Sequence, residues 1–158
     1  MAILTPGDDA PSFSLSDQSG SETVSLSDFK GRKLLVYFYP KADTPGCTTQ
    51  SCEVRDARED LATLGLDVVG ISPDRPGAQA AFDRKFSLGF PLLSDLDHAV
   101  ADAYGVWGEK VNYGKTYLGV IRSSFLIDED GVIERAWYKV APKDTVPNAR
   151  TALGTAAS

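Results

Sequence analysis

Two cysteines stand close together in the segment "YPKADTPGCTTQSCEVRD", which covers residues 39 to 56. They are the only cysteines of the chain, Cys47 and Cys52, and they lie five positions apart. Cysteine thiols act as nucleophiles, as redox couples or as metal ligands. The residues around the two thiols decide which of these kinds of chemistry the segment can support.

The residues before Cys47 predict the start of a helix. An apolar run over residues 33 to 39 is typical of a buried strand, and Pro40 suits the end of that strand, where no ladder N–H is needed. Thr44 is a natural N-cap and Pro45 a natural first helical residue. Cys47 therefore falls in the first helical turn, where unpaired N–H groups favour an anion.

A reactive cysteine at neutral pH needs more than this helix start. A free thiol is only about 3% ionised at pH 7, and moving its titration down by about 2.5 pH units requires about 3.4 kcal/mol. A helix terminus supplies ~0.3–1 kcal/mol, or about 2 kcal/mol in a partly buried site. We therefore expect a cation beside Cys47, and the one histidine, His98, does not stand out for that role.

The spacing of the two cysteines limits how they can react with each other. In an ideal helix, residues five positions apart have Cα atoms roughly 8–9 Å apart. A disulfide needs Cα atoms about 4.4–6.8 Å apart. Cys47 and Cys52 cannot bond while the helix is intact, and a disulfide requires the first turn to unwind. Gly46, two threonines and Ser51 make these turns weak ones.

The same residues have plainer interpretations. Thr44-Pro45 is, taken alone, an ordinary helix cap. An isolated buried cysteine is usually a small hydrophobic residue. Cys-x4-Cys without neighbouring histidines is a poor zinc site, and we expect neither a metal nor another cofactor.

The rest of the chain alternates between strand and helix patterns. The sequence predicts hairpins at 12–26 and 123–140, strands at 33–39, 66–72 and 90–95, helices at about 45–64, 77–87, 97–106 and 147–153, and a loop at 107–121. This order predicts an α/β protein with a central mixed β-sheet flanked by helices and an N-terminal β-hairpin. The thioredoxin-like fold is one member of that class.

Length, charge and hydropathy argue against several classes of function. The 158 residues predict a single domain over 1–158, with a tail that frays after about residue 153. The net charge of −6, without a Lys/Arg cluster, argues against nucleic acid and against an anionic membrane surface. The start of the chain has no secretory pattern and no apolar run is long enough for a bilayer. We expect a cytoplasmic protein, in which cysteines are more often catalytic or redox-active than structural.

The cysteine segment resembles the active-site segment of the peroxiredoxins, and specifically of their bacterioferritin-comigratory (Q-type) subfamily. The family motif Pro-x-x-x-Thr-x-x-Cys falls on Pro40, Thr44 and Cys47. A second stretch, "YGVWGEKVNYGKTYLGVIRSSFLIDEDGVI", resembles the part of the subfamily that carries its active-site arginine, here Arg122. The resemblance extends over most of the chain, from about residue 7 to residue 140.

This resemblance implies a thioredoxin-like fold and the reduction of hydroperoxides by cysteine. Cys47 would attack the peroxide and become a sulfenic acid. Cys52 would condense with it to an intramolecular disulfide, which thioredoxin or a similar dithiol would reduce. Because the resolving cysteine is in the same chain, no partner subunit is needed, and we expect a monomer.

The resemblance also assigns supporting roles. Arg122 would stabilise the thiolate and the charge that develops as the O–O bond breaks. The Thr44 hydroxyl would hold the peroxide, Pro40 would shield the site from water, and the N–H groups at Gly46 and Cys47 would bond the peroxide oxygens.

Some positions depart from the subfamily or are open to two interpretations. Val54 stands where the subfamily has Phe, and residues 141 to 158 match its usual ending poorly. Trp107 and Tyr113 are either pocket or partner residues, or simply packing residues. Arg55 is either a second cation near the cysteines or part of a solvated helix face.

Two rival functions stay open on the sequence. A thiol–disulfide oxidoreductase shares the fold class but normally carries Cys-x-x-Cys at the helix start, whereas this chain has Cys-x4-Cys. A non-catalytic binding or holdase domain would keep the fold and leave Cys47 slow to react with peroxide.

Overall fold

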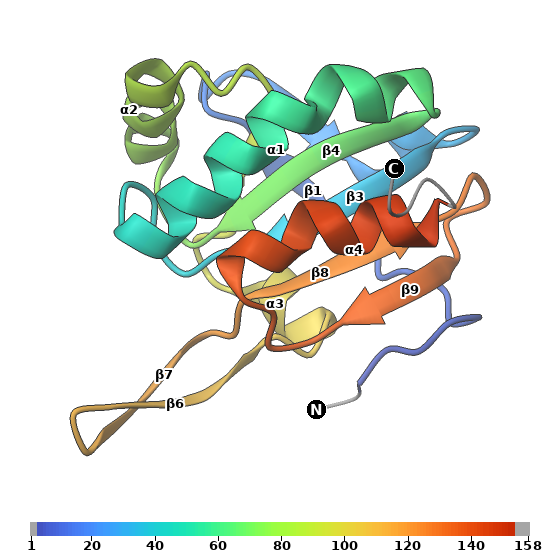
Figure 1. The fold of residues 1–158 in the computed structure, drawn as a ribbon. Helices are drawn as coiled ribbons and strands as arrows, with labels where there is room; N and C mark the ends of the chain where they lie inside the picture. The colour runs from blue at the N-terminus through green and yellow to red at the C-terminus, as the bar shows by residue number, and fades with distance from the viewer. Residues whose placement is uncertain (1–2, 154–158) are drawn as a thin grey trace.

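A computed structural model describes residues 3–153, and the expected fraying tail lies outside them. A seven-stranded sheet forms the centre of the molecule, in the order β2-β1-β5-β4-β3-β8-β9 (Figure 1). The strands of this sheet are β1 Ser14–Ser16, β2 Thr23–Ser25, β3 Lys33–Phe38, β4 Leu66–Ser72, β5 Leu92–Ser94, β8 Ser123–Ile127 and β9 Ile133–Trp137.

The sheet is mixed, as the sequence predicts. β3, β4 and β5 run parallel to one another. β1 joins β5, β8 joins β3, and β9 joins β8 in antiparallel pairs, and β1 with β2 forms the predicted N-terminal hairpin. The parallel pair β3–β4 is connected through a helix, as parallel strands require.

The central strand β3 is buried on both faces, and its side chains alternate between two hydrophobic clusters. Leu35 and Tyr37, with Tyr39 directly after the strand, belong to one cluster, and Leu34 and Phe38 belong to the other. This alternation follows from the two-residue period of a strand. The strand therefore contributes side chains to both clusters, and its carboxyl end leads directly into the cysteine segment.

Helices cover both faces of the sheet. Helices α1 Pro45–Thr63 and α4 Thr145–Ala152 lie next to each other on one face (Figure 1). Their buried side chains share a cluster with Phe82 of a third helix. The short helix α3 Ala99–Ala103 packs its buried residues into the cluster on the other face. The remaining helical elements are α2 Pro76–Phe86, η1 Leu26–Phe29 and η2 Pro142–Asp144.

The expected loop over residues 107–121 is wrong, because most of this segment forms a second, two-stranded sheet. Strands β6 Trp107–Asn112 and β7 Lys115–Val120 pair with each other and project from the body (Figure 1). Tyr113 and Gly114 connect them, both with positive φ (52° and 78°), as a two-residue hairpin turn requires. Tyrosine is an uncommon residue in that conformation, so the turn carried no sequence signal.

The hairpin at 123–140 is confirmed, and its turn is held by a carboxylate. The Oδ1 atom of Asp128 accepts hydrogen bonds from the backbone N–H groups of Asp130 and Val132, at 2.9 and 3.0 Å. Gly131 takes the left-handed φ of 81°. Among the described residues, no helix is both long and apolar enough to cross a membrane.

The core leaves no room for a side chain at Gly70 of β4. A β-carbon added there would lie 2.9 Å from the ring of Tyr37 and 3.1 Å from that of Tyr39. We expect Gly70→Ala to lower the free energy of unfolding by about 1–3 kcal/mol, because neither buried ring can move without shifting its neighbours. Gly77→Ala is the control, since a β-carbon there meets nothing within 4 Å. Equal midpoints for the two variants in urea unfolding would contradict this.

Candidate active site

Cys47 is the third residue of α1, in the first turn as the sequence predicts, and its side chain is fully buried. The chain leaves β3, passes Pro40 and enters the helix through Thr44, whose backbone is extended (φ −95°, ψ 156°). Pro45 is the first helical residue, where its missing N–H costs no hydrogen bond. The thiol thus sits at the amino end of a helix of 19 residues, close to its unpaired N–H groups.

The loop between β3 and α1 is fixed from the side of α2. The Ala42 N–H donates to Oδ2 of Asp74 at 2.7 Å. The Ser72 hydroxyl donates to the same carboxylate at 2.7 Å and accepts from the Gln79 amide at 2.8 Å. The buried Tyr39 hydroxyl donates to the other side of the Gln79 amide. This network ties the end of β3 and the loop to a neighbouring strand and helix.

Arg122 is the cation that Cys47 was expected to need. It lies just before β8, and its Nη2 atom is 3.3 Å from Sγ of Cys47. The guanidinium is half-buried, so its charge is less screened than at an open surface. Arginine stays protonated at any pH of interest and can therefore stabilise the thiolate throughout.

Gln50 accepts a hydrogen bond from the other terminal nitrogen of Arg122, and the sequence alone did not predict this contact. Its Oε1 atom accepts from Nη1 of Arg122 at 2.6 Å, and its Nε2 atom donates to Oγ1 of Thr145 at 2.8 Å. Gln50 follows Cys47 by three residues, and residues three apart lie on the same helix face. That spacing was the signal in the sequence that could have identified Gln50, because a polar side chain on the same helix face as a buried cysteine needs a hydrogen-bond partner.

Gly46 leaves the space that Arg122 occupies. A β-carbon on Gly46 would lie 3.1 Å from Nη2 of Arg122 and 3.4 Å from Cγ of Pro142. The glycine is needed for this close approach rather than for its backbone angles, since its φ is not positive.

Thr44 and Pro40 lie on the loop as expected, but the Thr44 side chain does not cap the helix as the sequence predicts. It occupies the N-cap position, yet its side chain makes no capping hydrogen bond within the described structure. Its hydroxyl donates instead to the carbonyl of Lys41 at 2.8 Å. The lone pairs of the Thr44 oxygen remain available as acceptors. Pro40 is half-buried at the end of β3.

Comparison with known proteins decides the family. The model of the AhpC/TSA family matches residues 6–136. The chain belongs to the AhpC/TSA family, and within it to the Bcp (Q-type) peroxiredoxins. It is 56% identical to peroxiredoxin Bcp of Escherichia coli over 137 residues, 87% of each chain. It is 46% identical to peroxiredoxin Bcp of Bacillus subtilis over 147 residues, 93% of each.

Solved structures agree with this assignment. The bacterioferritin comigratory protein of Xanthomonas campestris, studied for its alkyl peroxide reduction, superposes with a TM-score of 0.86 at 33% identity. That match covers 100% of this chain and 99% of the other. Peroxiredoxin Q of the same organism gives 0.85 at 33% identity, over 97% and 96% of the two chains. The thioredoxin-like fold expected from the resemblance is thereby confirmed.

The second cysteine of this peroxiredoxin lies on the same unbroken helix. Cys52 is half-buried and, like Cys47, is a free thiol. Between them, the Ser51 hydroxyl hydrogen-bonds the Tyr37 hydroxyl at 2.8 Å. Burial raises the pKa of Tyr37 far above its ordinary value of 10.0, so the phenol stays protonated. This buried pair fastens the segment between the cysteines to β3.

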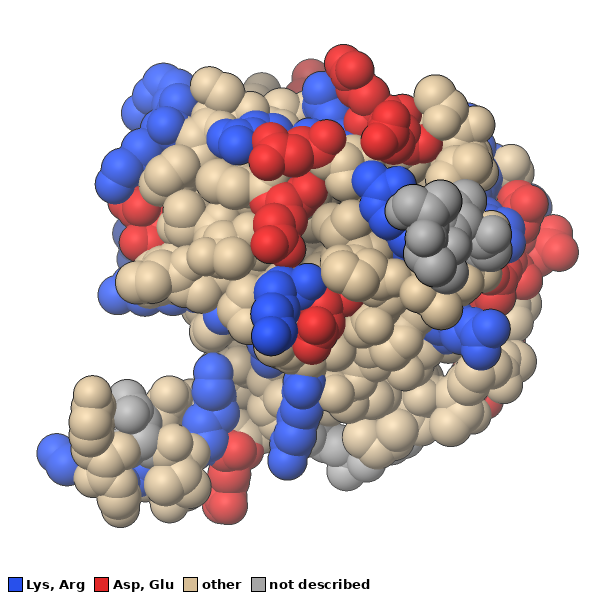
Figure 2. Space-filling view, viewed as in Figure 1, with Lys and Arg blue, Asp and Glu red and all other residues tan. Residues whose placement is uncertain are grey.

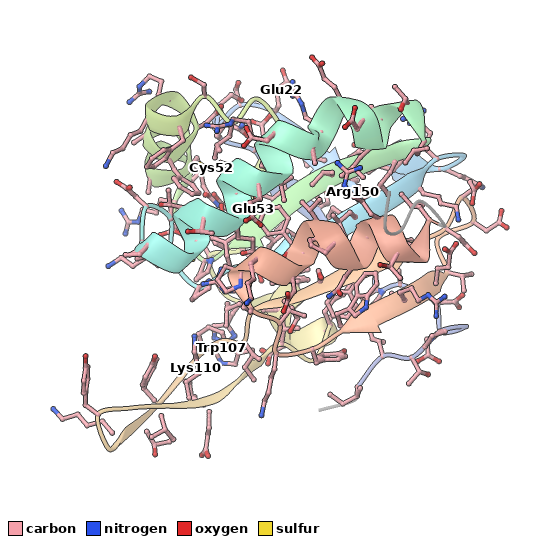
Figure 3. All side chains as sticks on the ribbon, viewed as in Figure 1. Glu22, Cys52, Glu53, Trp107, Lys110 and Arg150 are labelled. Atoms are coloured by element: carbon pink, nitrogen blue, oxygen red, sulfur yellow. The ribbon has the colours of Figure 1, made fainter. Side chains whose placement is uncertain are left out.

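A groove gives access to the guanidinium of this peroxiredoxin. It encloses about 500 Å³ and is lined by Glu109, Lys110, Val111, Ile121, Arg122, Lys139 and Val140. Lys110 lies where the β6–β7 ribbon meets the body (Figure 3) and donates to the Val120 carbonyl at 2.8 Å. Burial, and then the charge of Arg122, lower the pKa of its ammonium group. Figure 2 shows the ribbon standing off from the body beside this groove.

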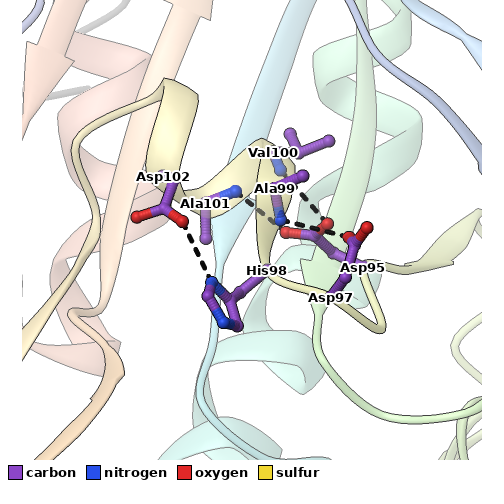
Figure 4. Close-up of polar contacts among 7 residues, drawn as sticks. All are labelled: Asp95, Asp97, His98, Ala99, Val100, Ala101 and Asp102. Atoms are coloured by element: carbon purple, nitrogen blue, oxygen red, sulfur yellow. Dashed lines mark hydrogen bonds and ion pairs between the residues drawn. The ribbon is translucent and has the colours of Figure 1, made fainter.

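The His98 side chain packs against Trp107 and pairs with Asp102. Its ring stacks on Trp107, with centroids 3.9 Å apart and planes 1° apart, and its Nδ1 lies 3.0 Å from Oδ2 of Asp102. The neighbouring Asp95 accepts from the N–H groups of Val100 and Ala101 and so fixes the start of α3 (Figure 4). Trp107 is therefore a packing residue at the base of the ribbon.

Two other sequence candidates lie apart from the thiol contacts. Tyr113 is 98% exposed at the tip of the ribbon. Arg55 donates to the Phe86 carbonyl at 2.6 Å and pairs with Asp56 at 2.9 Å, so its guanidinium is bound at the end of α2. Val54, where the subfamily has Phe, is fully buried in the cluster beneath α1.

The close approach at Gly46 can be tested directly. We expect Gly46→Ala to lower the second-order rate constant for peroxide about tenfold or more, because the new methyl group displaces the guanidinium from the thiol. The melting temperature should change little. Stopped-flow tryptophan fluorescence measures the rate.

Gly77→Ala is the matched control, since Pro-Gly opens α2 as it opens α1, but with nothing within 4 Å of the added β-carbon. Equal peroxide rates in the two variants would remove the steric role from Gly46.

Proposed function

We propose that this thiol peroxidase reduces hydrogen peroxide and organic hydroperoxides through Cys47. The observation that carries the proposal is the 3.3 Å contact between Nη2 of Arg122 and Sγ of the buried Cys47 at the start of a helix. A thiolate there is favoured by a permanent charge and by the helix terminus together, as the energy argument from the sequence requires.

The first step is attack of the Cys47 thiolate on the terminal oxygen of the hydroperoxide. The S–O bond forms as the O–O bond breaks, the sulfur is oxidised to a sulfenic acid, and water or an alcohol leaves after taking up a proton. Arg122 stabilises the negative charge that grows on the departing oxygen. The acceptor lone pairs of Thr44 and the N–H groups at Gly46 and Cys47 hold the peroxide in line.

The second step joins the two cysteines. The Cys52 thiolate attacks the sulfenic sulfur of Cys47, the disulfide forms, and hydroxide leaves and is protonated to water. The intact α1 holds the two Cα atoms too far apart for this bond, so its first turns must unwind before the step. A thioredoxin-type dithiol then reduces the disulfide and is itself oxidised.

We propose further that residues 1–158 form one domain that acts as a monomer in the cytoplasm. An intrachain resolving cysteine supports the monomer, because no thiol from a partner subunit is needed to form the disulfide. The fold and the −6 charge support a small-molecule substrate and a protein reductant over nucleic acid or a membrane surface.

The guanidinium geometry is tested with a charge-conserving substitution. We expect Arg122→Lys to lose most of the peroxide rate, about tenfold to thousandfold, because an ammonium group cannot bond Cys47 and Gln50 with two separate nitrogens. Stopped-flow mixing of the reduced protein with hydrogen peroxide measures the second-order rate constant. An unchanged constant would remove Arg122 from the mechanism.

The resolving role is tested with Cys52→Ser. We expect this variant to reduce one equivalent of peroxide at nearly the parent rate and then to stall with thioredoxin, because the sulfenic acid has no thiol to meet. Mass spectrometry should show Cys47 advancing to sulfinic acid as peroxide is raised. Full multiple turnover with thioredoxin would mean that another thiol resolves the sulfenic acid.

A further inference from the structure

Gln50 is a fully buried amide whose two ends are both engaged. Its oxygen accepts from Nη1 of Arg122 at 2.6 Å, while the other terminal nitrogen of Arg122 contacts Cys47 at 3.3 Å. Its nitrogen donates to Thr145 at 2.8 Å, and Thr145 is the first residue of α4 and is itself fully buried. A chain of contacts therefore runs from the thiol to the C-terminal helix.

The direction of the amide is dictated by its neighbours. A guanidinium has donors only, so the amide oxygen must face Arg122 and the amide nitrogen must face away from it. The Thr145 hydroxyl can then accept from that nitrogen. A flipped amide would set N–H groups against the N–H groups of Arg122 and leave buried donors unpaired, which is costly in a dry site. Arg122 thus selects the orientation of the Gln50 amide, and the Thr145 hydroxyl satisfies the amide nitrogen that this orientation turns away from the guanidinium.

We propose that Gln50 positions Arg122 on Cys47, and that Thr145 holds Gln50 in place, so that the start of the C-terminal helix supports the peroxidatic site. The inference rests on the proposed roles of Cys47 and Arg122. Gln50 is a positioning residue, since it acts on the thiol through the guanidinium.

The physical need for such a residue comes from the flexibility of arginine. A free arginine side chain has considerable rotamer entropy, and a contact with one terminal nitrogen does not fix the plane of the guanidinium. A neutral acceptor on the second nitrogen fixes that plane without adding a negative charge that would oppose a thiolate. The arrangement leaves the positive charge of Arg122 for Cys47.

The same contacts connect the opening of α1 to α4. Gln50 lies between Cys47 and Cys52, within the turns that must unwind before a disulfide forms. Unwinding those turns withdraws the amide from Arg122 and from Thr145 together. Formation of the disulfide therefore releases the guanidinium from its aligned position and loosens the start of α4.

The test measures peroxide rate constants for the full-length reduced protein by stopped flow. We expect Gln50→Met, which keeps the length of the side chain but not its hydrogen bonds, to lower the rate constant about tenfold to hundredfold. Gln50→Glu keeps an acceptor for Arg122 and should restore a large part of the loss.

A double-mutant cycle separates positioning from general damage. In the Arg122→Lys background, Gln50→Met should lower the rate by less than about twofold, because the two residues act as one unit.

The contribution of the C-terminal helix is tested at Thr145. We expect Thr145→Val to lower the peroxide rate about threefold to tenfold, the scale of one buried hydrogen bond, and Thr145→Ser to retain the parent rate. Val146→Ala is the matched control, since Val146 is the next residue of α4 and packs in the core. It should lower the melting temperature and leave the rate within about twofold, which shows that loosened packing alone is not the cause.

Distinct results would overturn the inference and the function on which it rests. If the parent protein is fast and Arg122→Lys is slow, a Gln50→Met variant with the parent rate overturns the positioning role alone. Additive losses in the double variant, or a Thr145→Val rate equal to that of the parent, would overturn the coupling to Arg122 or to α4. A parent protein that does not react with peroxide would overturn the proposed function itself.

Discussion

One unbroken helix carries both cysteines, and its rigidity is the constraint on which the rest of the site depends. While α1 is intact, Cys47 is buried against Arg122 and Cys52 is too far along the helix to reach it. In the mechanism that we propose, the Cys47 thiol can then react with a peroxide but not with Cys52. Attack and resolution thus need two conformations of the same segment, and the stability of the first turns sets the balance between them.

Two opposing features act on those turns. Gly46 and the threonines that follow Cys47 are poor helix formers, which lowers the cost of opening. Buried polar contacts oppose this, since Ser51 bonds Tyr37 and Gln50 bonds both Arg122 and Thr145. These contacts break together when the segment unwinds, so the closed state is held cooperatively although its helix propensity is weak.

Local sequence signals predicted the elements that carry the site, but not the contacts between them. The limits of β4 agree with the sequence, α1 ends one residue short of its predicted end, and Cys47 falls in the first turn. The need for a cation followed from energies, but its identity as Arg122, 75 residues away, came only from the family resemblance. The Gln50–Thr145 bond joins residues 95 apart and had no local signal. The β6–β7 ribbon was missed because its turn uses a tyrosine with positive φ.

Hydrogen exchange of the reduced and oxidised protein tests the helix constraint most directly. The parent chain is oxidised with one equivalent of peroxide, the Cys47–Cys52 disulfide is verified by mass spectrometry, and exchange is compared peptide by peptide. The account predicts faster exchange across about residues 45 to 55 after oxidation, while β3, Lys33–Phe38, stays protected. A protein that holds the disulfide and yet exchanges in residues 45 to 55 as slowly as the reduced form would contradict it.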